Sequence, residues 1–346
     1  MAVDIITARS ADVIGSIDGL LMQIFVRLPV KSLIRFKLVS KHWKSLITSH
    51  HFSLLRYPRP NPILGLVYPR RKSSVFEYIH LDVSNPNKPP FRELKFPGDS
   101  FWYGIQHSCN GLLLCCSSWN DPCYGMSPIR SCYVYNPTTK CSTKLPLPGV
   151  MNGVPENVYG VNLAFDPAKS PLYKVVCVRD SEFAHGLFQI EVYSAESRVW
   201  RVSGEPFSAT NCFDHGVYWN GSIHWIRYWP NKLLYFNVNE ETFGNMSLPA
   251  TMSVREIISY FGEFCDHLHI VESCVAQKIF DVYEMKRDYS EWFVKYRVDL
   301  TTAAAAFPDM AYVNELINNI WFPICVLTLI RVEEEGRFIL GFADFW

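Results

Sequence analysis

The sequence has no excess of charge of either sign and no long hydrophobic segment. Its 33 basic and 33 acidic residues balance, so the chain has no global charge that would attract nucleic acid or an anionic membrane. The longest apolar run near the C-terminus, residues 322–330, covers nine residues, whereas a spanning helix needs about 20. The first 15 residues include Asp4 and lack the apolar core of a secretory signal. We therefore expect a soluble intracellular protein, located in the cytoplasm, the nucleus or both.

Motifs of enzymes and of metal sites are also missing. The chain contains no G-x-S-x-G, P-loop or G-x-G-x-x-G sequence, and no nucleophile motif accompanies His215 or His224. Its eleven cysteines are odd in number and include no Cys-x-x-Cys pair, which disfavours a disulfide framework or a zinc site. Cys265, His267 and His269 would share one face of a strand, but no second cluster with ligand spacing accompanies them. We therefore expect a protein that is not an enzyme, has no cofactor and no metal, and keeps its cysteines as free thiols.

Residues 18–55 differ from the rest of the chain in charge and in hydrophobic spacing. They contain one acid, Asp18, and six Lys or Arg residues, a local net charge of +5, so the remainder of the chain carries −5. This asymmetry predicts that the segment meets an acidic surface. The hydrophobic residues at 20, 21, 24, 25 and 28 fall on one face of a helix. Asp18 is a suitable N-cap for this helix, and Pro29 ends it.

Two more short helices are predicted in the same segment, the second of them capped by Ser40. Their apolar residues are Leu33, Ile34 and Phe36 in one helix and Trp43, Leu46 and Ile47 in the other. Three short helices in about forty residues make a marginal core, which commonly needs a partner for stability. Exposed Leu, Phe and Pro side chains on such a unit would therefore form a docking surface.

From residue 57 onward the pattern is typical of short β-strands. Aromatic residues make up 15% of the chain, and aromatics favour strands. Apolar and polar residues alternate, and 22 prolines and 18 glycines separate the runs. Asn110-Gly111 and Asn220-Gly221 favour type I′ hairpins, because both turn residues tolerate positive φ. Residues 314–320 are the best candidate for a helix.

A loose repeat runs through the β segment, in which a strand, a polar turn and a second strand lead to a proline. Its copies are residues 133–148, 191–206 and 234–249, with weaker copies at 79–97 and 281–298. Steps of 43 to 58 residues between the anchors Tyr135, Tyr193, Phe236 and Tyr283 suit the four-stranded blades of a kelch-like propeller. An irregular β-sandwich is the alternative. No closing strand follows the apolar C-terminal strand, so we expect an incomplete last blade, or one closed by a strand near residues 63–68.

The N-terminal segment LLMQIFVRLPVKSLIRFKLVSKHWKSLITSHHF (residues 20–52) resembles an F-box, specifically a plant F-box. RLPVKSLIRFKLVSK and HWKSLI carry the match. F-boxes bind the Skp linker protein of cullin–RING ubiquitin ligases, and they usually open with a Leu-Pro pair where this chain has Ser16-Ile17. The resemblance implies a linker contact made by Leu20, Leu21, Ile24, Phe25, Leu28, Pro29, Val30 and Leu33.

The β segment resembles the F-box-associated domain of plant F-box proteins, on the segments NGLLLC, YVYNPTT, LAFDP…YKVVCV, EVYSAESRVWR and GVYWNGSIHWI. The two resemblances together cover nearly the whole chain. They imply an α+β protein with a flexible tail at residues 1–14, a three-helix F-box at 15–56 and an all-β, propeller-like domain at 57–346.

The resemblance implies a substrate-recognition adaptor subunit of a Skp–cullin–F-box (SCF) ubiquitin ligase. The F-box would join the linker protein, and through it the cullin–RING ligase, while the β domain holds a target protein that the sequence does not identify. Neither nucleic acid nor a membrane is an expected partner. Aromatic residues in loop-like segments are the candidate target contacts: Trp102, Tyr103, Trp119, Tyr124, Tyr228 and Trp229. Two alternatives are a scaffold with a decayed F-box acting outside a ligase, and a propeller that binds carbohydrate or acts as an enzyme.

Overall fold

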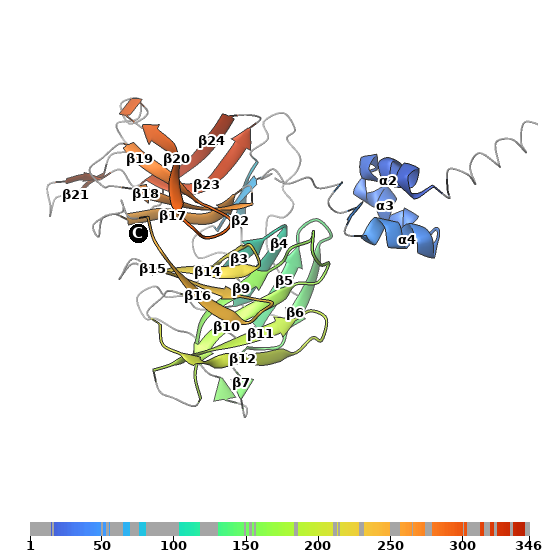
Figure 1. Ribbon diagram of the computed structural model, residues 1–346, viewed down its shortest axis with the longest axis horizontal. Helices are drawn as coiled ribbons and strands as arrows, with labels where there is room; N and C mark the ends of the chain where they lie inside the picture. The colour runs from blue at the N-terminus through green and yellow to red at the C-terminus, as the bar shows by residue number, and fades with distance from the viewer. Residues whose placement is uncertain are drawn as a thin grey trace, which may run out of the picture. The chain divides into compact units, whose positions relative to one another are not determined.

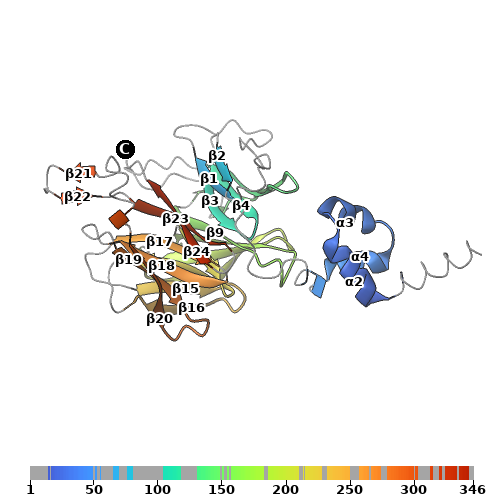
Figure 2. The ribbon, with the colours of Figure 1, turned by 90° about the horizontal axis from the view of Figure 1, so that it is seen from above.

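The computed structural model divides the chain into two compact units (Figure 1, Figure 2). The first, called the helical unit, includes residues 1–61 together with residues 166–171, and the second, the β unit, includes residues 62–165 and 172–346. The predicted tail at residues 1–14 lies outside the described residues. The structure describes residues 15, 17–49, 51–52, 55, 65–69, 76–80, 104–117, 131–148, 150–151, 154–155, 157–182, 186–209, 213, 215–227, 232–249, 257–264, 266–273, 279–299, 301–302, 312–314, 319–321, 324–332 and 335–342.

Among its described residues, the helical unit has three short helices with fully given bounds, which pack around one small core (Figure 1). They are α2 (Asp18–Arg27), α3 (Val30–Phe36) and α4 (Lys41–Thr48). Pro29 separates α2 from α3, because its ring cannot continue the first helix. The Phe25 ring lies at the centre of this core, with ring centroids 5.1 Å from Trp43 and 5.9 Å from Phe36. The fully buried side chains are Leu21, Met22, Phe25, Leu33, Ile47 and Phe52.

One of the two predicted helix caps is confirmed and the other is wrong. Ser40 caps α4, since its Oγ accepts the backbone N–H of Trp43 at 3.0 Å. Asp18 does not cap α2: the N-cap position is Ile17, and Asp18 is the first helical residue. Its carboxylate contacts His42 instead, with 2.9 Å between Oδ1 and Nε2. A negative charge in the first turn still favours the helix through the helix dipole.

Among its described residues, the β unit contains four antiparallel four-stranded sheets, each made of consecutive strands. The first sheet is β3 (Gly104–Cys109), β4 (Leu112–Ser117), β5 (Ser131–Asn136) and β6 (Cys141–Leu145). The second is β9 (Val158–Ala164), β10 (Lys174–Asp180), β11 (Phe188–Ser194) and β12 (Trp200–Phe207). The third is β13 (Val217–Trp219), β14 (Ser222–Arg227), β15 (Lys232–Asn237) and β16 (Thr242–Ser247). The fourth is β17 (Ile257–Phe264), β18 (His267–Ser273), β19 (Ile279–Met285) and β20 (Trp292–Asp299).

Successive sheets pack face to face, as the blades of a propeller do. One hydrophobic cluster fills the space between the first and second sheets, another joins the second to the third, and a third joins the third to the fourth. The first strands of the sheets, β3, β9, β13 and β17, lie next to one another in that order. Since apolar residues point to both faces of each blade, the middle strands are buried almost throughout. The predicted propeller-like all-β fold is confirmed.

The repeat read from the sequence corresponds to the third and fourth strands of each blade. Residues 133–148 span β5 and β6, 191–206 span β11 and β12, 234–249 span β15 and β16, and 281–298 span β19 and β20. Both Asn-Gly turns have the predicted positive φ, 45° and 86° at 110–111 and 50° and 81° at 220–221. These angles are those of type I′ hairpins.

The remaining strands form two-stranded sheets among the described residues. The pairs are β1 (Gly65–Pro69) with β2 (Phe76–His80), β7 (Val150–Met151) with β8 (Val154–Pro155), β21 (Tyr312–Asn314) with β22 (Asn319–Trp321), and β23 (Ile324–Val332) with β24 (Glu335–Phe342). β23 lies next to β17 and continues the row of first strands (Figure 1). The helix predicted over 314–320 is wrong at both ends, since Asn314 lies in β21 and Asn319 and Ile320 lie in β22, where Tyr, Val, Ile and Trp favour strands. Residues 315–318 lie outside the described residues.

The expectation that every cysteine is a free thiol is also wrong. Cys116 on β4 and Cys132 on β5 form a disulfide. The two residues are direct partners in the antiparallel register, with 4.2 Å between their Cα atoms. Cys115 and Cys141 are free thiols. The spacing of the cysteines along the chain does not reveal this pairing, because only the strand register brings the two side chains together.

Candidate protein-docking surface

Helix α2 has two apolar faces. Leu21 and Phe25 point into the core of the helical unit. Leu20 and Ile24, each one position earlier, are 41% and 44% exposed, and Ile17 before the helix is exposed as well. Each residue turns about 100° around a helix, so residues 17, 20 and 24 form a stripe on the solvent side. The core of the unit does not use this stripe, which leaves it available for a partner.

A second group of exposed apolar residues lies on α3 and the turn that follows it. Leu38 is 86% exposed, and Ile34 and Val39 are exposed too. The contact between Asp18 and His42 holds the first turn of α2 beside the first turn of α4. We call the six residues Ile17, Leu20, Ile24, Ile34, Leu38 and Val39 the apolar docking set. So many exposed aliphatic side chains on a unit this small are typical of an interaction site.

The eight residues predicted to contact the linker fall into three groups. Leu20, Ile24 and Pro29 are exposed. Leu21, Phe25 and Leu33 are buried in the core, and Leu28 is partly buried against it. The side chain of Val30 lies outside the described part of the chain. The prediction did not include Ile34, Leu38 and Val39. For Leu38 and Val39, the available signal was an aliphatic pair within a basic, polar segment of the sequence.

The six aromatic residues predicted to contact a target protein all fall outside the described residues. They are Trp102, Tyr103, Trp119, Tyr124, Tyr228 and Trp229. Their role therefore remains a prediction.

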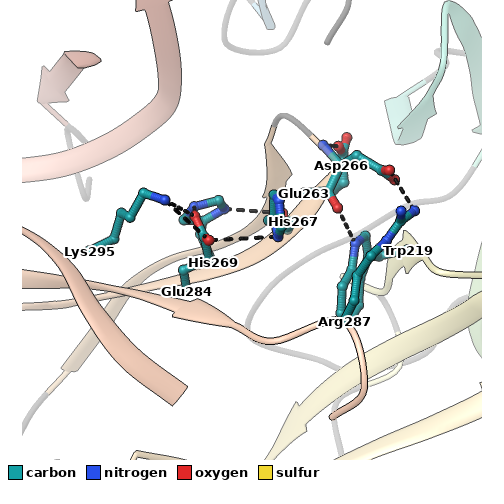
Figure 3. Close-up of polar contacts among 8 residues, drawn as sticks. All are labelled: Trp219, Glu263, Asp266, His267, His269, Glu284, Arg287 and Lys295. Atoms are coloured by element: carbon teal, nitrogen blue, oxygen red, sulfur yellow. Dashed lines mark hydrogen bonds and ion pairs between the residues drawn. The ribbon is translucent and has the colours of Figure 1, made fainter. Parts of the chain in front are cut away.

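Polar contacts connect the third and fourth blades (Figure 3). Trp219, the last residue of β13, donates from Nε1 to the backbone carbonyl of Asp266 at 2.8 Å. Arg287 contacts the carboxylate of the same Asp266 at 2.5 Å. The backbone carbonyl of Arg287 in turn accepts from the side-chain amide of Asn220 at 3.2 Å. These contacts fix two turns of the fourth blade against the start of the third.

The neighbouring cluster of His267, His269, Glu284 and Lys295 is an ion-pair network (Figure 3). Nε2 of buried His269 lies 3.1 Å from Glu284, and its Nδ1 lies 3.1 Å from the backbone carbonyl of His267. Both ring nitrogens of His269 thus face oxygen atoms, one of them on the ionised Glu284 carboxylate. Burial opposes this ionisation, but the hydrogen bond with His269 and the nearby His267 and Lys295 lower the pKa of Glu284 overall.

The sequence drew attention to Cys265, His267 and His269 as a possible metal cluster. Cys265 lies outside the described residues, and within them no group of three or more His, Cys, Asp or Glu side chains could hold a metal ion. The positive charge beside the Glu284 carboxylate comes from Lys295, whose Nζ lies 3.3 Å from it.

His224 is a fully buried, neutral histidine at the same blade junction. Its Nδ1 donates to the Val217 carbonyl at 3.2 Å, and its Nε2 accepts from the Tyr289 hydroxyl at 3.1 Å. Tyr289 comes from the fourth blade and stacks on His224 and Tyr235 of the third. Burial lowers the pKa of His224 from 6.5 to about 4.

We expect the stability of the β unit to fall as the pH is lowered from about 6.5 to about 4, because the unfolded chain then binds a proton that folded His224 does not. At pH 5 this single group should cost about 2 kcal/mol. Urea unfolding at pH 7 and pH 5 measures the loss. In His224→Gln the pH-dependent loss should shrink by that amount. An identical loss in both proteins would show that His224 does not contribute.

Comparison with known proteins relates both units to families. Residues 18–55 match the F-box domain, and residues 72–311 match the F-box associated beta propeller domain. F-box protein At5g07610 of Arabidopsis thaliana is 32% identical over 352 residues, which cover 95% of this chain and 81% of the relative. F-box protein At5g49610 of the same plant is 31% identical over 243 residues, covering 67% of this chain and 64% of the relative.

A three-helix unit with an exposed apolar surface, followed by a β-propeller, is the architecture of an F-box protein. The chain belongs to the F-box proteins that carry the F-box associated beta propeller domain, and it has relatives of this kind in Arabidopsis. Such proteins generally act as non-catalytic substrate adaptors of SCF ubiquitin ligases. Within the described part of the chain, no helix is both long enough and apolar enough to span a membrane.

Proposed function

We propose that this chain is a substrate receptor of an SCF ubiquitin ligase, and that it binds a Skp-type linker protein through the apolar docking set. The helical unit joins the ligase, and the β unit holds a target protein. Ubiquitin transfer is then accelerated by proximity, because the target's lysines stay near a separately bound, ubiquitin-charged enzyme at high effective concentration. This chain contributes no catalytic residue to that mechanism.

The exposed stripe on α2 is the observation that carries the proposal. Leu20 and Ile24 point away from a core that is already complete without them. Keeping two large aliphatic side chains in water costs about 25 cal/mol for each Å² that a partner could cover. Leu20 and Ile24 lie in α2, which the F-box match contains. A linker that covers it accounts for apolar residues that the fold of the chain itself does not require.

The Leu20→Ala, Ile24→Ala double variant tests the proposal. Truncating buried anchors of a protein interface often costs 2 kcal/mol or more, about thirtyfold in affinity. We therefore expect calorimetry with a recombinant plant Skp-type linker to show at least thirtyfold weaker binding. The helical content should not change, because neither side chain is part of the core.

Leu147→Ala is the matched control, since Leu147 is an exposed leucine in the β unit. Its affinity for the linker should equal that of the wild type. If the Leu20→Ala, Ile24→Ala variant also keeps wild-type affinity, the α2 stripe is not the docking site. If the wild type recruits the linker but never a cullin, the chain acts outside a ligase.

A further inference from the structure

The α3–α4 turn carries an exposed aliphatic pair, and basic residues flank this pair on both sides. Leu38 and Val39 form its tip. Four basic residues flank the tip in sequence, two before it and two after it, and the structure leaves them exposed or partly exposed. We call these residues the basic collar: Arg35, Lys37, Lys41 and Lys44.

Among the described residues of helices α2, α3 and α4, no acid neutralises the basic collar. No acidic residue occurs between positions 19 and 55, and the one acid of the segment, Asp18, is engaged with His42. Among the described residues, no carboxylate forms an ion pair with any member of the collar. The β unit differs, because there the cations Arg201, Arg287 and Arg297 each have a carboxylate partner.

We infer that the basic collar and the Leu38–Val39 tip receive an acidic patch of the Skp-type linker that surrounds a small apolar pocket. This inference rests on the proposed function and names the chemistry of the partner at the same site. Four like charges in a short segment repel one another. Exposure of the apolar Leu38–Val39 tip to water also costs free energy. A partner with carboxylates around an apolar pocket relieves both costs at once.

Two features favour an acidic protein surface over a phosphate-rich ligand. The foremost point of the turn is a leucine followed by a valine, which offer no hydrogen bond to phosphate. The tip is also continuous with the α2 stripe at the end of the unit where Asp18 meets His42. A linker seated on the stripe therefore reaches the turn without a second binding event.

The basic collar should act mainly on the association rate, because rim charges steer encounter and are screened by salt. The test uses the full-length chain and a recombinant plant Skp-type linker, with association followed by stopped flow at 50 and 300 mM NaCl. At low salt, Lys41→Glu, Lys44→Glu should associate about tenfold more slowly than the wild type. The wild type should slow markedly at 300 mM, whereas the variant should not. Both substitutions place acids in the first turn of α4, where the helix dipole favours them, so the fold should persist.

Two further variants complete the test. Lys140→Glu, Lys232→Glu makes the same change of charge at exposed positions of the β unit and should leave the rate unchanged. Leu38→Ser removes the apolar tip and should raise the dissociation rate instead. If the collar variant associates at the wild-type rate and keeps its salt dependence, the inference is overturned, while the Leu20→Ala, Ile24→Ala result still decides the proposed function. Weaker binding of the collar variant to phosphatidylserine vesicles, with unchanged linker kinetics, would also overturn it and assign the collar to a lipid surface.

Discussion

Replacing Arg179 with alanine is expected to destabilise the β unit by about 3–5 kcal/mol. The Arg179 side chain is only 1% exposed and lies within the second blade. Its Nε donates to buried Glu191 at 2.8 Å, and its two terminal nitrogens donate to Glu182 and to the Asp180 carbonyl at 2.9 and 2.8 Å. Without the guanidinium, the buried Glu191 carboxylate would lose its ion pair with Arg179. Denaturant unfolding followed by fluorescence of the buried tryptophans measures the loss.

Two comparisons isolate the buried charge as the cause. Glu182→Gln alters the more exposed partner of Arg179 and should cost less than about 1 kcal/mol, as surface pairs usually do. Replacing both charges, in Arg179→Met with Glu191→Leu, should recover much of the stability, because no unbalanced charge is then buried. Equal losses in Arg179→Ala and Glu182→Gln would contradict this account.

The repeated blades could be predicted from the sequence because their signals are local. Each turn that joins the third and fourth strands is only a few residues long and is flanked by alternating apolar and polar positions. Tyr135, Tyr193, Phe236 and Tyr283 occupy the third strand of successive blades. The two Asn-Gly turns need nothing beyond their own φ angles. Short-range signals of this kind do not depend on which blade packs against which.

The two faces of α2 could not be separated in the same way. Leu20 and Leu21 are identical in type and adjacent in sequence, yet one is exposed and the other is buried. The pattern predicts an apolar helix, but only the position of α4 and of the Trp43 ring decides which side becomes the core. A helix that packs on its own core and also binds a partner has two apolar sides. Hydrophobic periodicity cannot tell the core-facing side from the partner-facing side, so it assigns all the apolar residues to a single face.

Other differences arise from pairings that are distant in sequence. Asp18 meets His42, 24 positions later, and so does not act as a cap. Cys116 meets Cys132 because β4 and β5 are in register. Tyr289 covers His224 across a blade junction. None of these contacts has a local sequence signal, since each depends on how complete elements pack.

Replacing Phe25 with alanine is expected to unfold the helical unit and abolish linker binding. Phe25 is 1% exposed and packs on Phe36 and Trp43. A buried Phe→Ala change costs about 3–5 kcal/mol, while a core of this size rarely supplies more than about 3–5 kcal/mol in total. Hydrogen exchange of the full-length chain should therefore show lost protection within residues 18–55 and retained protection in the four blades, whose cores do not include Phe25.

The contrast with Ile24→Ala makes this result informative, because the two residues are adjacent on α2 but Ile24 is exposed and Phe25 is buried. Ile24→Ala should weaken linker binding while hydrogen exchange in residues 18–55 stays as in the wild type. Phe25→Ala should lose binding and protection together, and saturating linker should restore part of the protection, since a partner that binds only the folded unit stabilises it by mass action. If Ile24→Ala also exposes the helical amides, Ile24 belongs to the core. If Phe25→Ala leaves them protected, the helical unit is more stable than its small core allows, and part of its stability comes from elsewhere in the chain.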